Sequence, residues 1–362
     1  MEGLGLMDDI ASFYKGKKVL ITGHTGFKGA YLSRILQLFG AEVTGYSLMP
    51  PTEPSLFALA HLKEGMNSVC GDVRDLDFLK KTVAKTKPEI IFHLAAQPIV
   101  RLSYREPHLT FETNIMGTVN LLEAVRATDS VYSVVNVTTD KVYENNETGR
   151  PFKEDDPLNG YDPYSNSKSC SDIITQSYRK SFFSDDSCAI STARAGNVIG
   201  GCDFAEDRLI PDCVRAAFAG KDIEIRNPHS VRPYQHVMEP LSAYLLLGMK
   251  QSEDPSLIGA YNIGPDKSDC ITSGDMATFF CDEWNKENEG SSLKWINKSD
   301  GGPHEAGFLM LDNAKVKDVL GWKSCWDIHK AIEKTVEMES ARFRGKAVRF
   351  TLDRQIKEYF NV

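Results

Sequence analysis

Short runs of β-branched and other apolar residues alternate with longer amphipathic stretches along the chain from Lys18 onward. This alternation is typical of βαβ units, in which helices cover both faces of a parallel sheet. We therefore predict an α/β fold with a doubly wound parallel sheet, because apolar runs separated by helical stretches fit that arrangement. The predicted strands are 19–22, 42–45, 67–70, 90–94, 131–137 and 189–193, and the main predicted helices are 30–39, 76–85, 111–127 and 164–182.

After about Gly196 the alternation becomes less regular. We expect a sheet domain over residues 1–195 and a smaller α/β region over 196–362, with part of the second region returning to the sheet. In this second region the predicted helices are 210–219 and 242–250, and the short predicted strands are 223–226 and 260–263.

Composition and charge exclude several classes of protein. The 362 residues carry a formal net charge of -8, so the chain has no general attraction for nucleic acids or anionic membranes. The N-terminal segment lacks the basic stretch and apolar run of a secretory signal, and no stretch of about 18 consecutive apolar residues is present. We therefore expect a cytoplasmic protein. The eight cysteines are scattered without a CxxC pair, which predicts reduced thiols and no metal site.

A glycine-rich segment, VLITGHTGFKG, leads from the first predicted strand into a helix. Backbone N–H groups and the positive end of a helix dipole at such a turn bind the pyrophosphate of a dinucleotide. The segment is not a Walker loop, because Gly-Lys-Ser/Thr is missing. A tight turn with close helix packing is the alternative, but the position on the first strand favours a cofactor site. Its expected cofactor contacts are Gly23, Thr25, Gly26, Phe27 and Gly29.

The choice between NAD and NADP depends on the second and third strands. Asp72 and Val73 follow the third strand, where a carboxylate can bind an adenine amino group. Asp72 could instead cap the helix at 76–85, although Asp75 is better placed for that. The second strand ends in GYSL without the usual ribose-binding carboxylate, and no arginine follows Tyr46 closely to bind a 2′-phosphate. We expect NAD, held more loosely than in proteins that carry the ribose carboxylate.

Tyr164 and Lys168 in YSNSK are spaced i, i+4, which places them on one face of a helix. An ammonium group near a phenol lowers the phenol's pKa, and the phenolate can then take a hydroxyl proton while hydride leaves the same carbon. Tyr14 and Lys18 have the same spacing by chance, but they precede the first strand. We therefore expect the pair at 164 and 168 to be catalytic.

Polar residues also end the fifth predicted strand. Thr138, Thr139, Asp140 and Lys141 follow its carboxyl end, where side chains of a parallel sheet face the ligand crevice. The Thr139 hydroxyl can orient a reacting oxygen, and Asp140 can act as a general acid if its pKa is raised. An ordinary surface turn is the alternative for this segment.

These motifs resemble the Rossmann-like extended short-chain dehydrogenase/reductase superfamily, whose members act largely on nucleotide sugars. Within it the chain resembles the CDP-glucose 4,6-dehydratases through HLAAQPIVRLSYREPHLTFETNIMGT, TTDKVY, ARAGNVIGG, DRLIPD, RNPHSVRPYQHVMEPL and PHEAGFLMLD. The resemblance implies a lyase that converts CDP-glucose to CDP-4-dehydro-6-deoxyglucose and water, recycles NAD and supplies 3,6-dideoxyhexoses for bacterial lipopolysaccharide O-antigen. It also implies a homo-oligomer, dimer or tetramer. Cys202 and Phe204 depart from the family pattern, which more often has Gly and Trp.

The resemblance also implies roles for residues outside the motifs discussed so far. Residues 1–195 become the NAD-binding domain with the catalytic groups, and 196–362 the main nucleotide-sugar-binding region. Arg226, Arg232 and His236 are expected to form a basic cluster for the diphosphate. His93 is expected to be a satisfied core residue. The implied cofactor contacts are Leu94, Ala95, Ala96, Gln97 and Asn114, and the implied substrate contacts are Gln97, Asn197, Arg208, Arg232 and His304.

Lys141 raises a chemical problem, because related dTDP-glucose enzymes have a glutamate base at this position. A lysine with its ordinary pKa is protonated at neutral pH, so it must be desolvated or lie beside another cation to act as a base. Our hypothesis is that Lys141 is the base and Asp140 the acid of the elimination. Alternatively, Lys141 stays charged and stabilises the enolate while water or another group takes the proton.

Two other functions fit part of the pattern. A nucleotide-sugar 4-epimerase needs the glycine loop and Tyr164 with Lys168, but it eliminates no water and so has no need of an acid at Asp140. A non-catalytic NAD-binding sensor has no need of a poised phenolate, so the complete set of Thr139, Tyr164 and Lys168 disfavours it.

Overall fold

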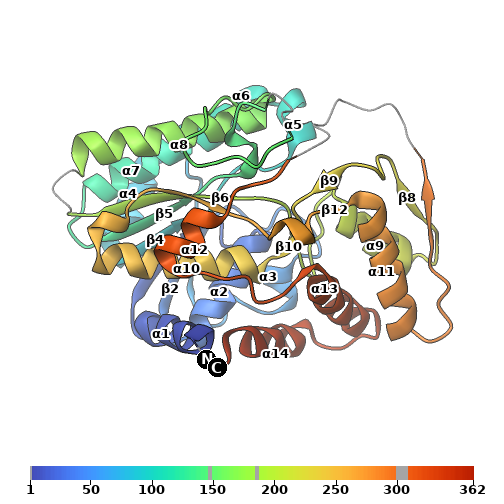
Figure 1. The fold of residues 1–362 in the computed structure, drawn as a ribbon. Helices are drawn as coiled ribbons and strands as arrows, with labels where there is room; N and C mark the ends of the chain where they lie inside the picture. The colour runs from blue at the N-terminus through green and yellow to red at the C-terminus, as the bar shows by residue number, and fades with distance from the viewer. Residues whose placement is uncertain (1, 146–148, 184–186, 299–308) are drawn as a thin grey trace.

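A seven-stranded parallel sheet forms the centre of the computed structural model, which describes residues 2–145, 149–183, 187–298 and 309–362 (Figure 1). The predicted doubly wound sheet is confirmed. Its strand order is β11-β6-β5-β4-β1-β2-β3, and every pairing is parallel. The strands are β1 (Lys18–Thr22), β2 (Glu42–Ser47), β3 (Asn67–Cys70), β4 (Ile90–His93), β5 (Ser133–Val137), β6 (Ala189–Ala195) and β11 (Ala260–Ile263).

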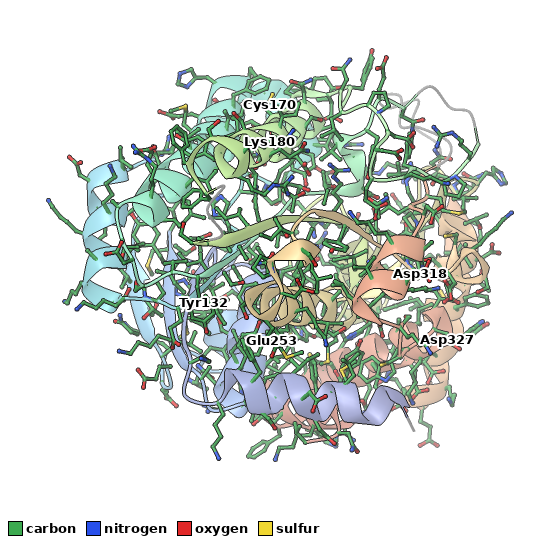
Figure 2. The ribbon with its side chains drawn as sticks, turned by 60° about the vertical axis from the view of Figure 1, so that its left-hand side comes forward. Tyr132, Cys170, Lys180, Glu253, Asp318 and Asp327 are labelled. Atoms are coloured by element: carbon green, nitrogen blue, oxygen red, sulfur yellow. The ribbon has the colours of Figure 1, made fainter. Side chains whose placement is uncertain are left out.

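Helices cover both faces of this sheet. One face is covered by α4 (Leu76–Thr86), α7 (Gly117–Arg126) and α8 (Pro163–Phe182), and the other by α2 (Phe27–Leu38) and α10 (Met238–Glu253), with α1 (Glu2–Tyr14) and α14 (Val348–Phe360) packed outside them. Figure 2 shows Cys170 and Lys180 on α8 at one side of the sheet and Glu253 at the end of α10 on the other.

Burial on both faces explains why the central strands β1, β4 and β5 are nearly continuous apolar runs, whereas the outer strand β3 is partly exposed. In β1, Val19 and Ile21 belong to the core under α2 and α10, whereas Leu20 belongs to the core under α4 and α7. The chain order of the strands reverses at β1, which lies between β2 and β4. In open α/β sheets, ligands bind at the carboxyl edge beside such a reversal.

A smaller unit stands beside the carboxyl edge of the sheet and has its own apolar core, which includes Phe280 and Trp284. It is built mainly from α9 (Leu209–Phe218), α11 (Ser273–Glu287) and α13 (Ile328–Phe343). Its short strand pairs are β8 (Ile223–Ile225) with β13 (Trp295–Asn297), β9 (Val231–Arg232) with β12 (Ile271–Thr272), and β7 (Val198–Ile199) with β10 (Gln235–His236). The remaining short elements are α3 (Leu56–Leu59), α5 (Val100–Arg105), α6 (Pro107–Phe111), α12 (Ala314–Leu320) and single turns at Asp140–Val142, Pro255–Leu257 and Lys267–Asp269.

The piece predicted at 260–263 forms the seventh strand of the sheet, with Ala260 opposite Thr192 of β6, so part of the second region returns to the sheet. One expectation about these elements needs correction. The helix predicted over 111–127 is interrupted by a π-helical turn, Glu112–Met116, before α7 begins. π-helical turns are frequent at functional sites because they redirect one side chain.

Membrane and metal features can be checked on the same residues. None of the helices in the described ranges is long and apolar enough to cross a membrane. All eight cysteines lie in those ranges and are free thiols. Within them, no group of three or more His, Cys, Asp or Glu side chains is arranged to hold a metal ion.

Candidate active site

A cleft of about 1990 Å³ opens at the carboxyl edge of the sheet, between the sheet and the smaller unit. Its lining includes the start of α2, the segments after β4 and β5, the first turns of α8 and the loop that follows β6. These segments carry most of the residues that the sequence singled out. Although the whole chain is acidic, the lining holds more lysine and arginine than aspartate and glutamate, which suits an anionic ligand.

The three glycines of the first loop have different structural reasons. Gly23 has φ +78°, and a Cβ there would lie 2.8 Å from the Ala95 nitrogen. A Cβ on Gly29 would lie 2.1 Å from the Gly23 oxygen, so this position allows α2 to pack closely. Gly26 caps α2 without a side-chain hydrogen bond, and a Cβ there would meet only the Gly23 oxygen at 3.4 Å. The helix start at Gly26 is therefore open to the cleft and fits a dinucleotide pyrophosphate.

The adenosine end of this site is polar but carries little free negative charge. Thr25 Oγ1 lies 2.8 Å from Ser47 Oγ, at the position where a ribose-binding carboxylate was missing from the sequence. Arg74 donates to Asp72 at 2.6 Å and to Glu112 at 2.7 Å, and the hydrogen bond from Arg74 lowers the pKa of Asp72. An adenine amino group would thus share the Asp72 carboxylate with Arg74.

Some expected assignments at this end are settled by hydrogen bonds and burial. Asp75 caps α4 by accepting a hydrogen bond from the Phe78 N–H, as expected. Val73 lines the cleft. His93 is buried and lies 2.7 Å from the Thr22 hydroxyl, so it is a satisfied core residue as predicted.

The segment after β4 brings Leu94, Ala95, Ala96 and Gln97 to the cleft wall. Asn114 does not line the cleft, contrary to our expectation of a cofactor contact. Its side chain accepts from the Gln97 N–H at 2.8 Å and donates to the Gln97 carbonyl at 3.1 Å and to Ser167 at 2.8 Å. The π-helical turn places Asn114 behind the wall, where it supports the Gln97 backbone.

Tyr164 and Lys168 lie one turn apart on α8 and both line the cleft. The Lys168 ammonium donates to the Val137 carbonyl at 3.0 Å, and burial lowers the pKa of Lys168 to about 8, against an opposing effect of Asp172. Burial raises the pKa of Tyr164 to about 12, while the Thr139 hydroxyl lowers it. The sequence argument had Lys168 lowering this pKa, but burial is the largest effect in the unliganded cleft.

Thr139, Asp140 and Lys141 lie in and before a single 3-10 turn, Asp140–Val142, directly after β5. The Thr139 hydroxyl donates to Asp140 Oδ1 at 2.9 Å, and Asp140 Oδ2 is buried without a partner among the described residues. Burial raises the pKa of Asp140, although nearby Lys141 opposes the shift. A carboxyl group in this position favours its protonated form, as a general acid requires. Lys141 lines the same cleft, as does Thr138.

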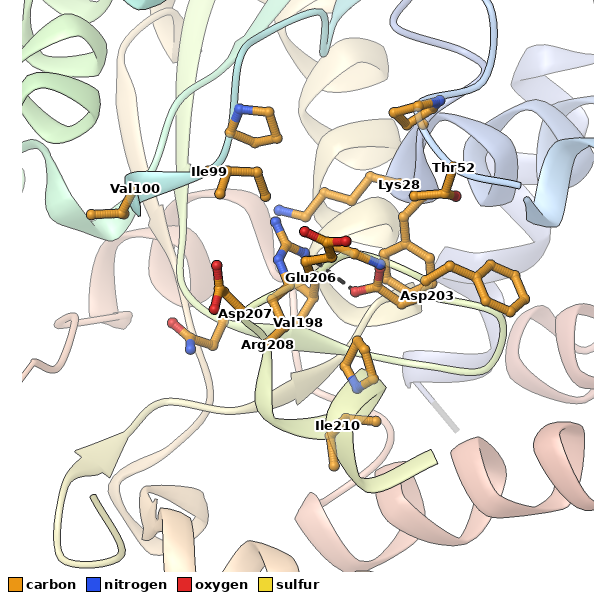
Figure 3. Close-up of a pocket in the computed structure, with 18 of the residues that line it drawn as sticks. Lys28, Thr52, Ile99, Val100, Val198, Asp203, Glu206, Asp207, Arg208 and Ile210 are labelled. Atoms are coloured by element: carbon orange, nitrogen blue, oxygen red, sulfur yellow. Dashed lines mark hydrogen bonds and ion pairs between the residues drawn. The ribbon is translucent and has the colours of Figure 1, made fainter. Parts of the chain in front are cut away.

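The expected substrate contacts lie on the opposite wall. Asn197, Arg208 and Arg232 all line the cleft, and Arg208 lies 3.3 Å from Asp203. Figure 3 shows Arg208 with the loop residues Asp203 and Glu206 near Lys28. His304 lies outside the described residues.

The proposed basic cluster is only partly correct. Arg226 and Arg232 line the cleft, and Arg226 lies 3.5 Å from Asp207. His236 does not join them: it is fully buried, with its ring 4.8 Å from that of Trp326. The reason is that the His236 ring packs against Tyr31 and Trp326, which belong to the main apolar core. Cys202, one of the departures from the family pattern, has φ +63°, a conformation that favours the glycine expected there.

Sequence reasoning missed Lys28, which reaches into the cleft from the first turn of α2 (Figure 3). Its ammonium lies 3.4 Å from the Tyr244 hydroxyl. Burial lowers the pKa of Lys28 to about 7, and the positive charges of Arg208 and Lys168 add to this effect. The sequence does contain a feature that could have indicated Lys28. A lysine in the first turn of a helix is unfavourable beside the positive end of the helix dipole, so its presence in a glycine loop suggests a role in the site.

A doubly wound sheet, a glycine loop at its first strand and a Tyr-Lys pair beside the fifth strand define an extended short-chain dehydrogenase/reductase. More narrowly, the chain belongs to the GDP-mannose 4,6 dehydratase family, whose model matches residues 20–335. It is 42% identical over 356 residues to a CDP-glucose 4,6-dehydratase from Salmonella typhimurium strain LT2, covering 97% of this chain and 98% of that protein.

More distant relatives share the same fold. A dTDP-glucose 4,6-dehydratase from Xanthomonas campestris is 25% identical over 88% of this chain and 92% of that protein. The structure of dTDP-glucose 4,6-dehydratase from Bacillus anthracis in complex with NAD has a TM-score of 0.73 at 21% identity, covering 90% of this chain and 97% of that one. The NAD complex of UDP-glucose 4-epimerase from Thermus thermophilus also has a TM-score of 0.73, at 24% identity, with 90% and 99% covered.

We predict that Gly26→Ala weakens NAD binding without destabilising the fold. The added Cβ would meet only one protein atom, at 3.4 Å, but would project into the space for the pyrophosphate. The dissociation constant of NAD, measured by calorimetric titration, should rise about tenfold or more. Gly264→Ala is a matched control, because its Cβ would also meet a neighbour at 3.4 Å but lies outside the cleft lining. Equal NAD affinity of the two variants would contradict the assignment of the pyrophosphate to the helix start at Gly26.

We also predict that Lys28→Met stabilises the unliganded protein in a pH-dependent way. Lys28 has a pKa of about 7 in the folded state against 10.5 in the unfolded state, so between these values the unfolded state binds more protons. Wild-type stability therefore rises with pH across this window, and the variant lacks that contribution. In urea titrations the variant's advantage should be largest below pH of about 7 and should shrink toward pH of about 10.

An exposed lysine provides the control for this measurement. Lys15→Met should change the free energy of unfolding little at any pH. A Lys28→Met advantage that is constant across the whole pH range would show that the lost charge is not its cause.

Proposed function

We propose that the chain is an NAD-dependent hydro-lyase that converts CDP-glucose to CDP-4-dehydro-6-deoxyglucose and water. The observation that carries this proposal is the arrangement of two catalytic pairs in one cleft, Tyr164 with Lys168 and Asp140 with Lys141. The first pair suits oxidation of an alcohol, and the second suits elimination of water. The 42% identity to a protein named CDP-glucose 4,6-dehydratase supports the substrate.

NAD would lie along the carboxyl edge of the sheet, with its pyrophosphate at Gly26 and the start of α2. When bound, NAD would supply the hydride acceptor for C4 of the sugar and the hydride that is returned to C6. The choice of NAD over NADP is supported by Ser47 and Thr25 at the ribose position, with the nearby Arg74 engaged by two carboxylates. The residues that would hold it are Gly23, Thr25, Gly26, Phe27, Gly29, Asp72, Val73, Leu94, Ala95, Ala96, Gln97, Thr138, Tyr164 and Lys168.

For the oxidation, we assign Tyr164 as the base that takes the proton of the C4 hydroxyl, and Thr139 as the group that orients this hydroxyl. Because burial raises the pKa of Tyr164 to about 12, the phenol needs positive charge nearby to give up its proton. Lys168 on the same helix and Arg208 across the cleft provide such charge. Their positive charge favours the Tyr164 phenolate.

For the elimination, the C4 ketone makes the C5 proton acidic. Lys141 takes this proton, the C5–H electrons form the C5=C6 double bond, and the C6–O bond breaks. Asp140 gives its proton to the departing oxygen, which leaves as water. Its buried, unpartnered Oδ2 and raised pKa support this acid role. After hydride addition at C6, the proton held by Lys141 returns to C5, and Asp140 is reprotonated from solvent.

The substrate's diphosphate is assigned to Arg208 and Arg232, with Asn197, Gln97 and His304 as further substrate contacts. Bidentate arginine suits a diphosphate, and the smaller unit supplies both arginines opposite the proposed cofactor site. A 4-epimerase is not favoured, because a reaction without elimination leaves the buried acid at Asp140 unused.

We further propose a homo-oligomer that associates through the outer face of α7, α8 and the π-helical turn. Large apolar side chains are exposed there, with Met116 at 47%, Ile173 at 49% and Phe182 at 50%. The cytoplasm is the proposed location, supported by the eight free thiols. The product's 4-keto-6-deoxy chemistry suits synthesis of dideoxyhexoses for lipopolysaccharide O-antigen.

We predict that Tyr164→Phe abolishes hydride transfer while CDP-glucose still binds. Wild-type protein incubated with CDP-glucose and NAD should form a 4-keto-6-deoxy sugar, detected by mass spectrometry. The variant should form neither product nor NADH. Tyr161→Phe is a nearby control, because Tyr161 is 91% exposed and should keep wild-type turnover. Normal turnover by Tyr164→Phe would require another base.

We predict that Lys141→Met separates the two halves of the reaction. The variant should still form NADH from CDP-glucose, because Tyr164, Lys168 and Thr139, which we assign to the oxidation, are unchanged, but it should stall before water is lost. In D₂O the wild-type product should carry deuterium at C5, since the base exchanges its proton with solvent. Product release by the variant at the wild-type rate would refute the base role. Failure to form NADH would show that Lys141 acts before the elimination.

A further inference from the structure

A buried polar network lies next to the turn that carries Asp140 and Lys141. At its centre is Arg194 on β6, which is 1% exposed. Its guanidinium donates to both Asp172 oxygens, at 2.8 and 2.9 Å. It also donates to the Tyr143 hydroxyl at 2.8 Å. The network therefore joins β6, α8 and the end of the turn.

Tyr143 is the member of this network that belongs to the turn's own segment. Its ring stacks on Phe152 with centroids 4.9 Å apart and an angle of 2°, and it is only 2% exposed. Its hydroxyl accepts from Arg194 and donates to Asn262 Oδ1 on β11. Burial raises the pKa of Tyr143, so the hydroxyl keeps the proton that it donates. Neighbouring elements thus fix this side chain on several sides.

Hydrogen bonds to residues of α8 hold both ends of the turn between β5 and Tyr143. At its start, the Thr138 hydroxyl donates to Asp172 at 3.2 Å. Near its end, the Ser169 hydroxyl donates to the Val142 carbonyl at 2.7 Å. Between these points the Asp140 carboxylate accepts one hydrogen bond within the described part of the chain, and it comes from the adjacent Thr139. The position of Asp140 therefore depends on the backbone of the turn.

Tyr164 and Lys168 are placed differently. They lie in the first turns of a 20-residue helix, which Asp162 caps by accepting from the Ser165 N–H. Lys168 has its own bond to the Val137 carbonyl. The helix fixes this pair without any contribution from the Tyr143 hydroxyl.

We propose that Tyr143 is a positioning residue for the elimination step: its hydroxyl, held between Arg194 and Asn262, sets the turn that places Asp140 and Lys141. This inference rests on the proposed function. It implies that the two half-reactions respond differently to the loss of one hydroxyl group. Oxidation depends on Tyr164 and Lys168 on α8 and on Thr139 at the β5 end of the turn, where the Thr138 hydroxyl is bonded to Asp172, so it should continue. Proton removal from C5 and loss of water should slow.

The test uses Tyr143→Phe, which removes the hydroxyl and keeps the stacked ring. In single-turnover reactions with CDP-glucose and NAD, NADH should form at the wild-type rate and accumulate. The rate of water loss and the incorporation of deuterium at C5 should fall about tenfold, the effect expected from one buried hydrogen bond. The turnover number should fall, whereas the KM for CDP-glucose should stay unchanged.

Tyr261→Phe is the matched control. Tyr261 is a buried tyrosine on β11, next to Asn262, but its hydroxyl donates to the Leu257 carbonyl. This variant should show no accumulation of NADH. Asn262→Leu removes the acceptor of the Tyr143 hydroxyl. Like Tyr143→Phe, it should slow the elimination more than the oxidation.

A measurement without substrate or cofactor tests the cause directly. Amide hydrogen exchange over residues 140–143 should be faster in Tyr143→Phe than in wild type, and exchange over the first turns of α8 should be unchanged. A variant that exchanges faster throughout the sheet domain would be generally destabilised, which would overturn a specific positioning role.

Several outcomes separate this inference from the proposed function. Equal slowing of oxidation and elimination in Tyr143→Phe would overturn the positioning role alone. Selective slowing of elimination in the control Tyr261→Phe would do the same. So would a stall in Lys141→Met together with wild-type kinetics in Tyr143→Phe. Failure of the wild type to dehydrate CDP-glucose would overturn the proposed function, and this inference with it.

Discussion

Arg194 and Asp172 form an ion pair inside the protein, with 1% and 0% of their side chains exposed. Removing two charges from water is costly, and a buried pair persists only when hydrogen bonds satisfy the remaining donors and acceptors. Here Tyr143, Thr138 and Gln176 supply such bonds. Loss of one partner would leave the other charge buried and unpaired, at a cost of about 3–5 kcal/mol. The pair thus holds together β6, α8 and the segment after β5, the three elements that bring the catalytic side chains to one edge of the sheet.

The same exclusion of water gives the cleft its chemical character. Burial lowers the pKa of Lys168 to about 8 and that of Lys28 to about 7. It also raises the pKa of Tyr164 to about 12 and shifts that of Asp140 upward. All four shifts lie toward the neutral form, because burial disfavours the charged form of each group. A charged ligand that enters this cleft changes the pKa of these groups, because an opposite charge nearby favours the charged form and a like charge disfavours it.

The sequence predicted those parts of the molecule that depend on local pattern. The apolar runs of β1, β4 and β5 and the more polar runs of β2, β3 and β6 all form strands of the sheet, and the carboxyl edge of a parallel sheet gathers the residues that follow them. Features that depend on distant contacts were not predictable. The pattern did not show which strand β11 pairs with, and it did not show the π-helical turn that carries Asn114, whose side chain bonds to Gln97 and Ser167. Lys28 was not predicted as a site residue, because the glycine pattern around it already accounted for a pyrophosphate-binding turn.

The fold alone does not decide which reaction takes place. An epimerase and a dehydratase structure match this chain equally well, each with a TM-score of 0.73. What distinguishes their reactions is chemical: both need a base for a hydroxyl proton, but only elimination needs an acid for the leaving oxygen and a base for a carbon-bound proton. In this chain we assign the first task to Tyr164 and Lys168 on α8 with Thr139, and the second to Asp140 and Lys141 in the three-residue turn Asp140–Val142. Because a turn can change sequence without disturbing the helix or the cofactor loop, one scaffold can gain or lose elimination while it keeps its redox chemistry.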